Sequence, residues 1–400
     1  MKGQPATRQS SIHATRQSSI PATRQSSIPA ARQSSIVATR QSSIVVRPQP
    51  MDSATYTASS RLQAAGLIRA QELLEQCAAM VPLPPPARPV TIADYGAANG
   101  YNSLKPIGAA IAAVRARTRP DHAILVTHTD VPDNDFTALF STLNEDQDSY
   151  LAADGAAFAT ALGRSFYQQI LPSDSITLGW SSWATHWLSR LPAAIGDHIH
   201  ISHSTDEPAR RAFTRQAAED WHDFVAFRGR ELAPGGRLVV LTLAVDDDGR
   251  AGFGPLMDAL HDGLGTLAAD GVITAAEVTR MAIPTVGRAE EELRAPFAPS
   301  GRFEGLSVEH LETFDAEDRF WIRYQHDGDA EKLGARWAGF ARAAVFPTLT
   351  TALDGGTADP RATEFSARLQ ATVAAGLARN PAPMSIPLAA VVLAKQHRPE

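Results

Sequence analysis

The chain has 400 residues, of which 44% are hydrophobic and 20% are charged, a composition typical of a soluble globular protein. Its length suits one large domain or two modest ones. The single cysteine, Cys77, excludes an intrachain disulfide bond and a cysteine-based zinc site. The lack of a possible disulfide fits a reducing, cytoplasmic setting, which we expect. No apolar run approaches the ~20 residues that a membrane helix needs, so we expect no membrane span.

Charge is unevenly distributed along the chain. Residues 1–50 contain one Lys, six Arg and no Asp or Glu, and therefore carry a net charge of +7. Because the whole chain carries −6, residues 51–400 carry −13. An acidic folded region is a poor match for a phosphate backbone, so we expect no nucleic acid partner.

The first fifty residues form a tandem octapeptide repeat, in which Arg recurs every eight residues from Arg8 to Arg40. One isoleucine per unit gives too little apolar surface for a core, so we predict that residues 1–50 are disordered. Three interpretations of the repeats stay open. They are translated repetitive DNA upstream of a true start at Met51, a basic tail that binds a partner or is phosphorylated, or an organelle transit segment.

Predicted helices and strands alternate between residues 59 and 250. Hydrophobic periodicity predicts helices at Ser59–Met80, Asn102–Thr118, Asp133–Leu143 and Pro208–Leu232, and strands at Val90–Asp94, Ala123–Thr129, Ser175–Ser181 and Arg237–Ala244. This alternation predicts an α/β fold with a mostly parallel sheet that is covered by helices on both faces. Ligands of such sheets bind beyond the carboxyl ends of the strands.

The region 251–350 changes character and is predicted to be a mostly helical cap packed over the sheet. Its apolar pattern predicts helices at Phe253–Ala269, Thr274–Met281 and Lys332–Phe346. We predict that residues 351–400 return to the α/β domain of residues 51–250 with a helix and a last strand. The apolar run Pro387–Lys395 is the expected last strand.

A glycine-rich turn follows the first predicted strand. Within Ile92–Ser103, Asp94 stands at the strand end and is followed by Gly96, Gly100 and the start of a helix. Glycine has no Cβ to block a ligand, and the helix N-terminus offers unpaired N–H groups. The spacing differs from the G-x-G-x-x-G of dinucleotide-binding proteins. It is similar to the first motif of S-adenosylmethionine-dependent methyltransferases.

Six motifs stand in a fixed order: Tyr56–Gln63, Ile92–Ser103, Asp130–Phe136, Ser165–Pro172, Ser181–Ser189 and Arg228–Arg237. Together they resemble the motifs of the SABATH family of carboxyl and N-methyltransferases, over about residues 56–396. The resemblance implies a Rossmann-like methyltransferase sheet with an α-helical cap over the active site. It also implies S-adenosylmethionine as cofactor and a small carboxylic acid as substrate. Because the first motif begins at Tyr56, the pattern favours Met51 as the natural start.

Transferred position by position, the resemblance implies a cofactor site and a substrate site. The cofactor site would consist of Tyr56, Ser60, Asp94, Gly96, Asn102, Asp130, Val131, Ser165 and Phe166. A carboxylate such as that of Asp130 can accept hydrogen bonds from both ribose hydroxyls. In the substrate site, Gln63 and Trp187 would hold the substrate carboxylate and so act as the catalytic pair. Trp183 and His186 would line the same wall.

The chain departs from the family pattern at several positions. Ala97 replaces a cysteine, Ser59 replaces an asparagine and Trp183 replaces a tyrosine. Aromatic positions that face the substrate in plant members correspond to Met257 and Val286, and crowding cap positions correspond to Ala341 and Ala344. Methionine adapts to flexible chains. These residues predict a wider, more aliphatic pocket and a fatty-acid-like substrate.

The chemistry needs no general base. A carboxylic acid of pKa ~4–5 is already ionised at pH 7, and the methyl group of a sulfonium is already activated. What remains is in-line placement and the exclusion of water. Neutral donors such as the Gln63 amide and the Trp187 indole hold a carboxylate without quenching its nucleophilicity, whereas an arginine would stabilise the ground state more.

Three histidines, His198, His200 and His203, lie close together in the sequence. No cysteine and no well-spaced carboxylate accompanies them, so the spacing does not predict a metal site. A family asparagine that is linked to metal in some members is Ala282 here. We therefore expect no metal.

The sequence thus predicts an O-methyltransferase that makes methyl esters of small or medium-chain apolar carboxylic acids. One alternative is an N-methyltransferase of the same fold, against which the Gln63 and Trp187 pair argues. Another is a non-catalytic cofactor-binding protein whose repeat tail docks a partner. A homodimer is an open alternative to a monomer, because the family often forms dimers.

Overall fold

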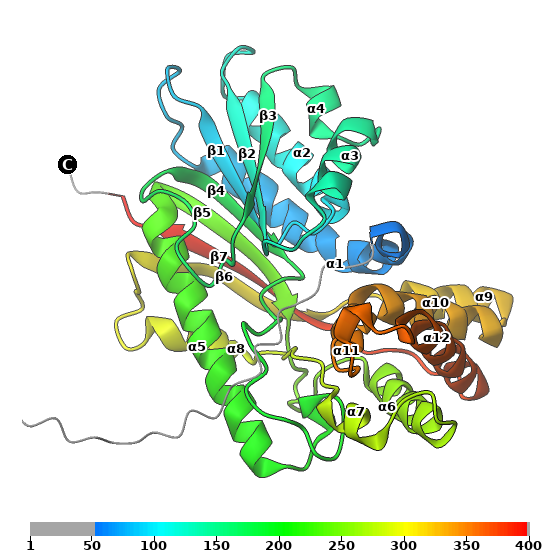
Figure 1. The fold of residues 1–400 in the computed structure, drawn as a ribbon. Coiled ribbons are helices and arrows are strands. Elements are labelled where there is room, and N and C mark those ends of the chain that lie inside the picture. The colour runs from blue at the N-terminus through cyan, green and yellow to red at the C-terminus, as the bar shows by residue number, and fades with distance from the viewer. Residues whose placement is uncertain (1–52, 398–400) are drawn as a thin grey trace, which may run out of the picture. The chain divides into compact units, whose positions relative to one another are not determined.

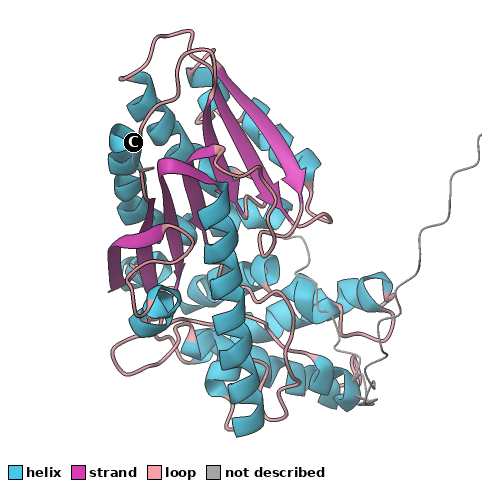
Figure 2. Cartoon of the chain, turned by 90° about the vertical axis from the view of Figure 1, so that its left-hand side faces the viewer, coloured by secondary structure: helices cyan, strands magenta, loops and turns pink. Residues whose placement is uncertain are grey.

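The computed structural model describes residues 53–397, with side chains from Gly66 onward. Its centre is a sheet, drawn in magenta in Figure 2. The sheet has seven strands in the order β3-β2-β1-β4-β5-β7-β6. The strands are β1 (Val90–Tyr95), β2 (Ile124–Asp130), β3 (Ala157–Gly163), β4 (Ile176–Ser182), β5 (Leu232–Leu243), β6 (Leu306–Asp315) and β7 (Pro387–Lys395). Strands β1 to β5 pair in parallel, whereas β7 runs antiparallel to both of its neighbours. This arrangement confirms the predicted Rossmann-like α/β fold.

The strand order reverses at β1. From β1 the chain moves outward through β2 to β3, and then returns to place β4 on the other side of β1. Ligands of open α/β sheets bind in the crevice beyond the carboxyl ends of the strands at such a reversal. The topology therefore places the expected binding site at the ends of β1 and β4.

Twelve α-helices surround or extend from the sheet in the described residues (Figure 1). They are α1 (Ser53–Met80), α2 (Tyr101–Arg115), α3 (Phe136–Glu145), α4 (Tyr150–Ala153), α5 (Glu207–Glu231), α6 (Gly254–Ala269), α7 (Ala275–Arg280), α8 (Glu290–Arg294), α9 (Arg319–Asp327), α10 (Ala330–Ala344), α11 (Phe346–Thr350) and α12 (Ala362–Arg379).

Both faces of the sheet are covered. Along β1, Ile92 joins the core that includes α1 and α2, while the next residue, Ala93, joins the core that includes α5. All seven residues of β4 are buried. Such continuous burial is expected of a parallel strand that has helices on both sides, because successive side chains point to opposite faces.

The cap is a group of helices beside the sheet, at the lower right of Figure 1. Helix α10 packs against α12, and α12 packs against α6. Trp337 is fully buried at its centre, with the rings of Phe320 and Phe253 at centroid distances of 5.1 and 6.0 Å. The packing of α12 on α6 and α10 joins a helix from residues 351–400 to the helices of residues 251–350.

Two strands, β3 and β6, were not predicted from the sequence. Both lie at an edge of the sheet and expose one face, so neither shows the continuous apolar run of a central strand. Strand β6 falls inside the predicted helical cap, with alternating polar residues on its outer side. Strand β5 begins at Leu232, before the predicted Arg237, and its pairing with β4 is irregular near this point.

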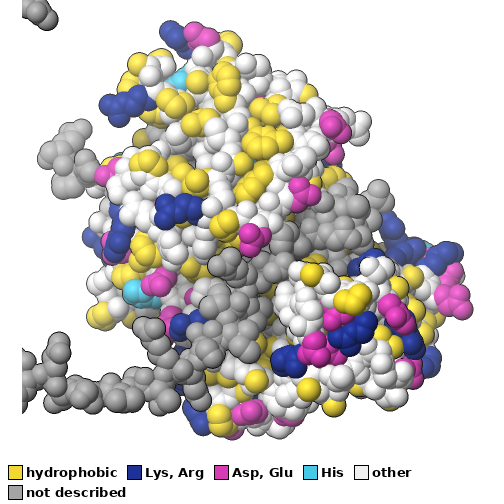
Figure 3. All heavy atoms as spheres, in the orientation of Figure 1, with side chains coloured by type: hydrophobic (Ala, Val, Ile, Leu, Met, Phe, Trp, Pro, Cys, Tyr) yellow, Lys and Arg dark blue, Asp and Glu magenta, His cyan; other side chains and the backbone are white. Residues whose placement is uncertain are grey.

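Charged side chains of both signs are interspersed over the cap helices on the face shown in Figure 3. None of the helices in residues 53–397 is long and apolar enough to cross a membrane.

Candidate functional site

A cavity of about 700 Å³ opens at the strand reversal. Its volume lies within the range of small-molecule sites. The end of β2, the loops after β1, β2, β3 and β4, one face of α5 and one residue of α10 line it. Among the lining residues are Gly96, Ala98, Asp130, Val131, Ser165, Phe166, Trp183, Trp187 and Ala344.

The turn after β1 forms the floor of this cavity. Gly96 has a φ of +88°, and a Cβ at this position would overlap the Cβ of Ala184. The amides of Gly96 and Ala97 donate to the carbonyl of Thr129 at 2.9 and 3.0 Å, which ties the turn to β2. Only glycine fits here, because both the conformation and the close approach exclude a side chain.

Asp130 ends β2 and points its carboxylate to the cavity. One oxygen accepts a hydrogen bond from the Ala98 amide at 2.8 Å, and the other accepts one from the Val131 amide at 2.7 Å. Burial raises the pKa of Asp130 to about 6. Each oxygen retains a lone pair, so the anchored carboxylate can accept two more hydrogen bonds from a vicinal diol.

Asp94 is buried below the turn and is not among the residues that line the cavity. Its carboxylate accepts from Nδ1 of His128 at 2.8 Å, and the other nitrogen of His128 lies 2.8 Å from the Tyr150 hydroxyl. Asn102, in the first turn of α2, also lies outside the cavity lining. Direct cofactor contacts by Asp94 and Asn102 stay predictions.

Ser165 and Phe166 belong to the loop between β3 and β4, and a buried arginine holds this loop. Nη1 of Arg228 donates to the carbonyl of Phe166 at 2.6 Å, and Nη2 donates to that of Gln168 at 2.9 Å. The rings of Tyr95 and Phe224 lie 4.4 and 5.2 Å from the guanidinium carbon. The end of α5 therefore fixes one wall of the cavity.

Glu231 neutralises this arginine and binds the same loop. Two guanidinium nitrogens of Arg228 donate to its two oxygens, each at 2.9 Å. The amides of Ile170 and Leu171 donate to Glu231 Oε1 at 2.7 and 2.9 Å, and the Tyr95 hydroxyl donates to Oε2 at 2.9 Å. Both ionic side chains are completely buried, so each depends on the other for its charge balance.

The opposite wall carries the two predicted tryptophans. Trp183 follows β4 with a φ of +55°, and its amide donates to the carbonyl of Leu241 at 2.9 Å. Nε1 of Trp183 and Nδ1 of His186 are buried without a hydrogen-bond partner in the described part of the chain. Unsatisfied buried donors are rare and indicate a ligand or water that completes them.

His186 lies behind this wall, with its ring centroid 5.9 Å from that of Trp187 and 6.2 Å from that of Trp183. Burial, with the nearby positive charge of Arg288, lowers the pKa of His186 to about 3. The imidazole is therefore neutral at pH 7, and with so low a pKa it is a poor general base.

Of the four residues that were predicted to give an aliphatic substrate pocket, only one lines the cavity. Ala344 lines the cavity, whereas Ala341 is buried behind it. Met257 packs in the core beneath the cap, and Val286 packs in a separate apolar cluster. Neither is a lining residue, so their contact with a substrate stays a prediction.

Tyr56, Ser60 and Gln63 lie in α1, in the part of the helix whose side chains are not described. Their roles therefore stay predictions.

Sequence reasoning missed the polar end of the cavity. Gln216, Glu219, Asp220 and Asp223 line it from one face of α5. Their spacing of three and four residues, on a helix predicted from the sequence, was the available signal. Asp220 accepts from the Ser189 amide at 2.7 Å, which ties α5 to the segment that carries the tryptophans.

The reversed strand order, the glycine turn and the anchored carboxylate together define a Rossmann-like protein with a site for a nucleoside-containing cofactor. The sequence profile of the SAM dependent carboxyl methyltransferases matches residues 47–390. The chain therefore belongs to this family, the SABATH methyltransferases, whose cofactor is S-adenosylmethionine.

Named relatives agree with this assignment. The chain is 29% identical to methyltransferase LUC1 of Fusarium sp. over 243 residues, which span 60% of this chain and 63% of LUC1. It is 27% identical to salicylate carboxymethyltransferase of Clarkia breweri over 276 residues, 65% of this chain and 74% of that one. The chain thus spans less than two thirds of LUC1.

A solved structure of loganic acid methyltransferase with SAH has the same fold. It superposes with a TM-score of 0.68 at 21% identity and covers 88% of this chain and 99% of its own.

We predict that cofactor affinity depends on the charge of Asp130. The ionised carboxylate is the form that accepts two hydroxyl hydrogen bonds, so affinity should be full well above pH 6 and fall as the pH drops through about 6. Well below this value the loss should approach about tenfold per pH unit. Calorimetric titration with S-adenosylhomocysteine at several pH values measures the affinity. Asp130→Asn should bind weakly at every pH, and an unchanged pH profile in this variant would contradict the assignment.

We predict that Glu231→Gln destabilises the fold by about 3–5 kcal/mol, because it leaves the charge of Arg228 buried and uncompensated. Urea unfolding measures the change. The matched control is Glu309→Gln, since Glu309 forms a partly exposed ion pair with Arg237 at 2.7 Å and should contribute about 0–1 kcal/mol. Equal destabilisation by both variants would disprove the central role of the buried pair.

Proposed function

We propose that the protein is an S-adenosylmethionine-dependent O-methyltransferase that converts a small or medium-chain apolar carboxylic acid to its methyl ester. The observation that carries this proposal is a single cavity that joins an anchored acceptor, Asp130, to a wall with Trp183 and Trp187. Membership of the carboxyl methyltransferase family supports the reaction class. The names of the Clarkia breweri salicylate relative and of the Arabidopsis thaliana jasmonate O-methyltransferase support an acid substrate.

The residues present fit the cofactor. Gly96 and Asp130 line the same cavity, and Asp130 offers acceptors for a ribose diol. Val131, Ser165 and Phe166 would border the adenine. When bound, S-adenosylmethionine supplies a methyl group that is already activated by its sulfonium.

The protein's own part is to orient the substrate and to exclude water. An ionised carboxylate is its own nucleophile, so no side chain has to remove a proton. Trp187 would donate to one carboxylate oxygen, with Gln63 as the second donor. The neutral His186 agrees with this scheme, because it adds no positive charge that would stabilise the ground state.

The proposed substrate class follows from the cap side of the cavity. Ala344 presents a single methyl group where a larger side chain would shorten the space. The cavity also has an apolar tryptophan wall, and its polar part contains Glu219 beside Arg190, with 3.5 Å between their charged groups.

The reaction is tested by incubating the protein with methyl-labelled S-adenosylmethionine and a panel of aliphatic acids, aromatic acids and ring-nitrogen heterocycles. We expect labelled methyl esters of medium-chain aliphatic acids, extractable into organic solvent. If only esters of aromatic acids are labelled, the proposed reaction stands and the proposal of an aliphatic substrate is wrong. Labelled heterocycles, or cofactor binding with no labelled product, would overturn ester formation itself.

We predict that Trp187→Phe lowers kcat/KM for the acid about 10- to 100-fold, because a hydrogen bond to a charged group contributes about 1.5–3 kcal/mol. The affinity for the cofactor should not change. Trp321→Phe is the matched control, because Trp321 lies on α9 and does not line the cavity. Steady-state kinetics measure kcat/KM for both variants. Equal values would show that Trp187 does not donate to the substrate carboxylate.

A further inference from the structure

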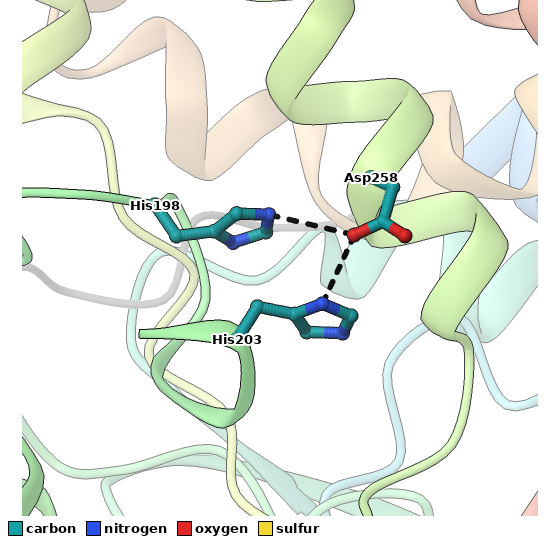
Figure 4. A group of neighbouring side chains, drawn as sticks. All are labelled: His198, His203 and Asp258. Atoms are coloured by element: carbon teal, nitrogen blue, oxygen red, sulfur yellow. Dashed lines mark ion pairs between the residues drawn. The ribbon is translucent and has the colours of Figure 1, made fainter. Parts of the chain in front are cut away.

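A second polar cluster lies where the segment before α5 meets the first cap helix, α6 (Figure 4). It consists of His198, His203 and Asp258. Oδ1 of Asp258 lies 3.0 Å from Nδ1 of His203 and 3.8 Å from Nε2 of His198. All three potential ligand atoms lie within 4.8 Å of one another. Figure 4 shows the two rings and the carboxylate pointing toward a common point.

The separations suit a small transition-metal ion. Two ligand atoms that each lie about 2.1 Å from one ion at a tetrahedral angle are about 3.4 Å apart. The distances of 3.0 and 3.8 Å from the carboxylate oxygen lie on either side of this value. Imidazole nitrogen with carboxylate oxygen is a donor set that Zn²⁺ accepts.

One buried nitrogen of the cluster, and one beside the cluster, make no hydrogen bond. The His198 side chain is only 9% exposed, and its Nε2, which points to Asp258, makes no hydrogen bond in the described part of the chain. His261 stacks on His198 with ring centroids 4.5 Å apart, and its Nδ1 is also buried without a hydrogen-bond partner. Buried polar atoms without partners require an explanation, and a metal ion explains the Nε2 atom of His198.

The hydrogen bonds of His198 show what metal binding would require of its ring. His198 Nδ1 accepts from the His200 amide at 3.1 Å. To bind metal through Nε2, this ring therefore moves its proton to Nδ1 and gives up that hydrogen bond.

We propose that His198, His203 and Asp258 form a Zn²⁺-type metal site that joins the cap to the core. His261, about one helical turn from Asp258 on α6, stacks on the ring of His198 and covers it. The spacing of the histidines did not predict this site, because its carboxylate comes from a separate helix.

The site lies behind the proposed substrate wall. The carbonyl of Ile199 accepts from the Ile283 amide at 2.8 Å, and Nε2 of His200 lies 3.0 Å from the Thr285 hydroxyl. Thr285 in turn forms a β-bridge with Trp187. A metal would thus hold α6 against the segment that supports Trp187, and would stabilise the cap without taking part in methyl transfer.

The test uses the full chain without an affinity tag, after removal of metal with a chelator. We expect one Zn²⁺ per chain by calorimetry and elemental analysis, and a higher melting temperature in its presence. Co²⁺ in the same site should give the visible absorption of a tetrahedral complex. Asp258→Asn and His203→Gln should each weaken Zn²⁺ binding at least tenfold and abolish the thermal shift.

Two variants serve as controls. Asp262→Asn changes an exposed acid on the same helix, and His222→Gln changes an exposed histidine beside Asp223. Both should bind Zn²⁺ as the unchanged protein does. Binding of less than one equivalent, or equal binding by Asp258→Asn and the controls, would overturn the proposal and leave an ordinary histidine–aspartate pair. Because the readouts are affinity, spectrum and melting temperature, they do not depend on methyltransferase activity.

Discussion

The cavity wall at Ser165 and Phe166 depends on one buried ion pair, between Arg228 and Glu231. A charge with no water around it is tolerated only when its partners satisfy all of its hydrogen bonds. Here those partners are backbone groups of the β3–β4 loop and the hydroxyl of Tyr95 at the end of β1. The loop can supply the hydrogen bonds that the buried ions need in only one conformation. In that conformation the loop lies beside the glycine turn.

The central part of the fold could be predicted because its strands are buried on both sides. Strand β7 is apolar almost throughout, and such a run stands out in a sequence. The edge strands β3 and β6 expose one face, and their mixed composition hides them. The packing of α12 on α6 depends on contacts between distant segments, which periodicity within one helix does not reveal.

In the site too, some residues could be placed from the sequence and others could not. Gly96, Asp130 and Trp187 follow strand ends, where the topology alone brings separate segments together, and all three line the cavity. Met257 and Val286 were assigned by their position on cap elements, whose orientation is set by three-dimensional packing. Asp258 is one residue from Met257, and only the fold shows that it faces two histidines from another segment. The cavity lining thus includes Gly96, Asp130 and Trp187 but not Asp94 at the end of β1, and of the predicted residues of the cap it includes Ala344.

Helix α1 packs against α2, which flanks the sheet, and against α10 of the cap. Ala344, at the end of α10, lines the cavity. Helix α10 therefore connects α1, in the amino-terminal part of the fold, to the substrate side of the cavity. A fusion partner or a surface attachment that pulls on α1 would therefore act on the cavity itself. The exposed loop residues 247–250, between β5 and α6, belong to neither the contact of α1 with α2 nor that of α1 with α10. They are therefore a suitable point of attachment when the protein is immobilised.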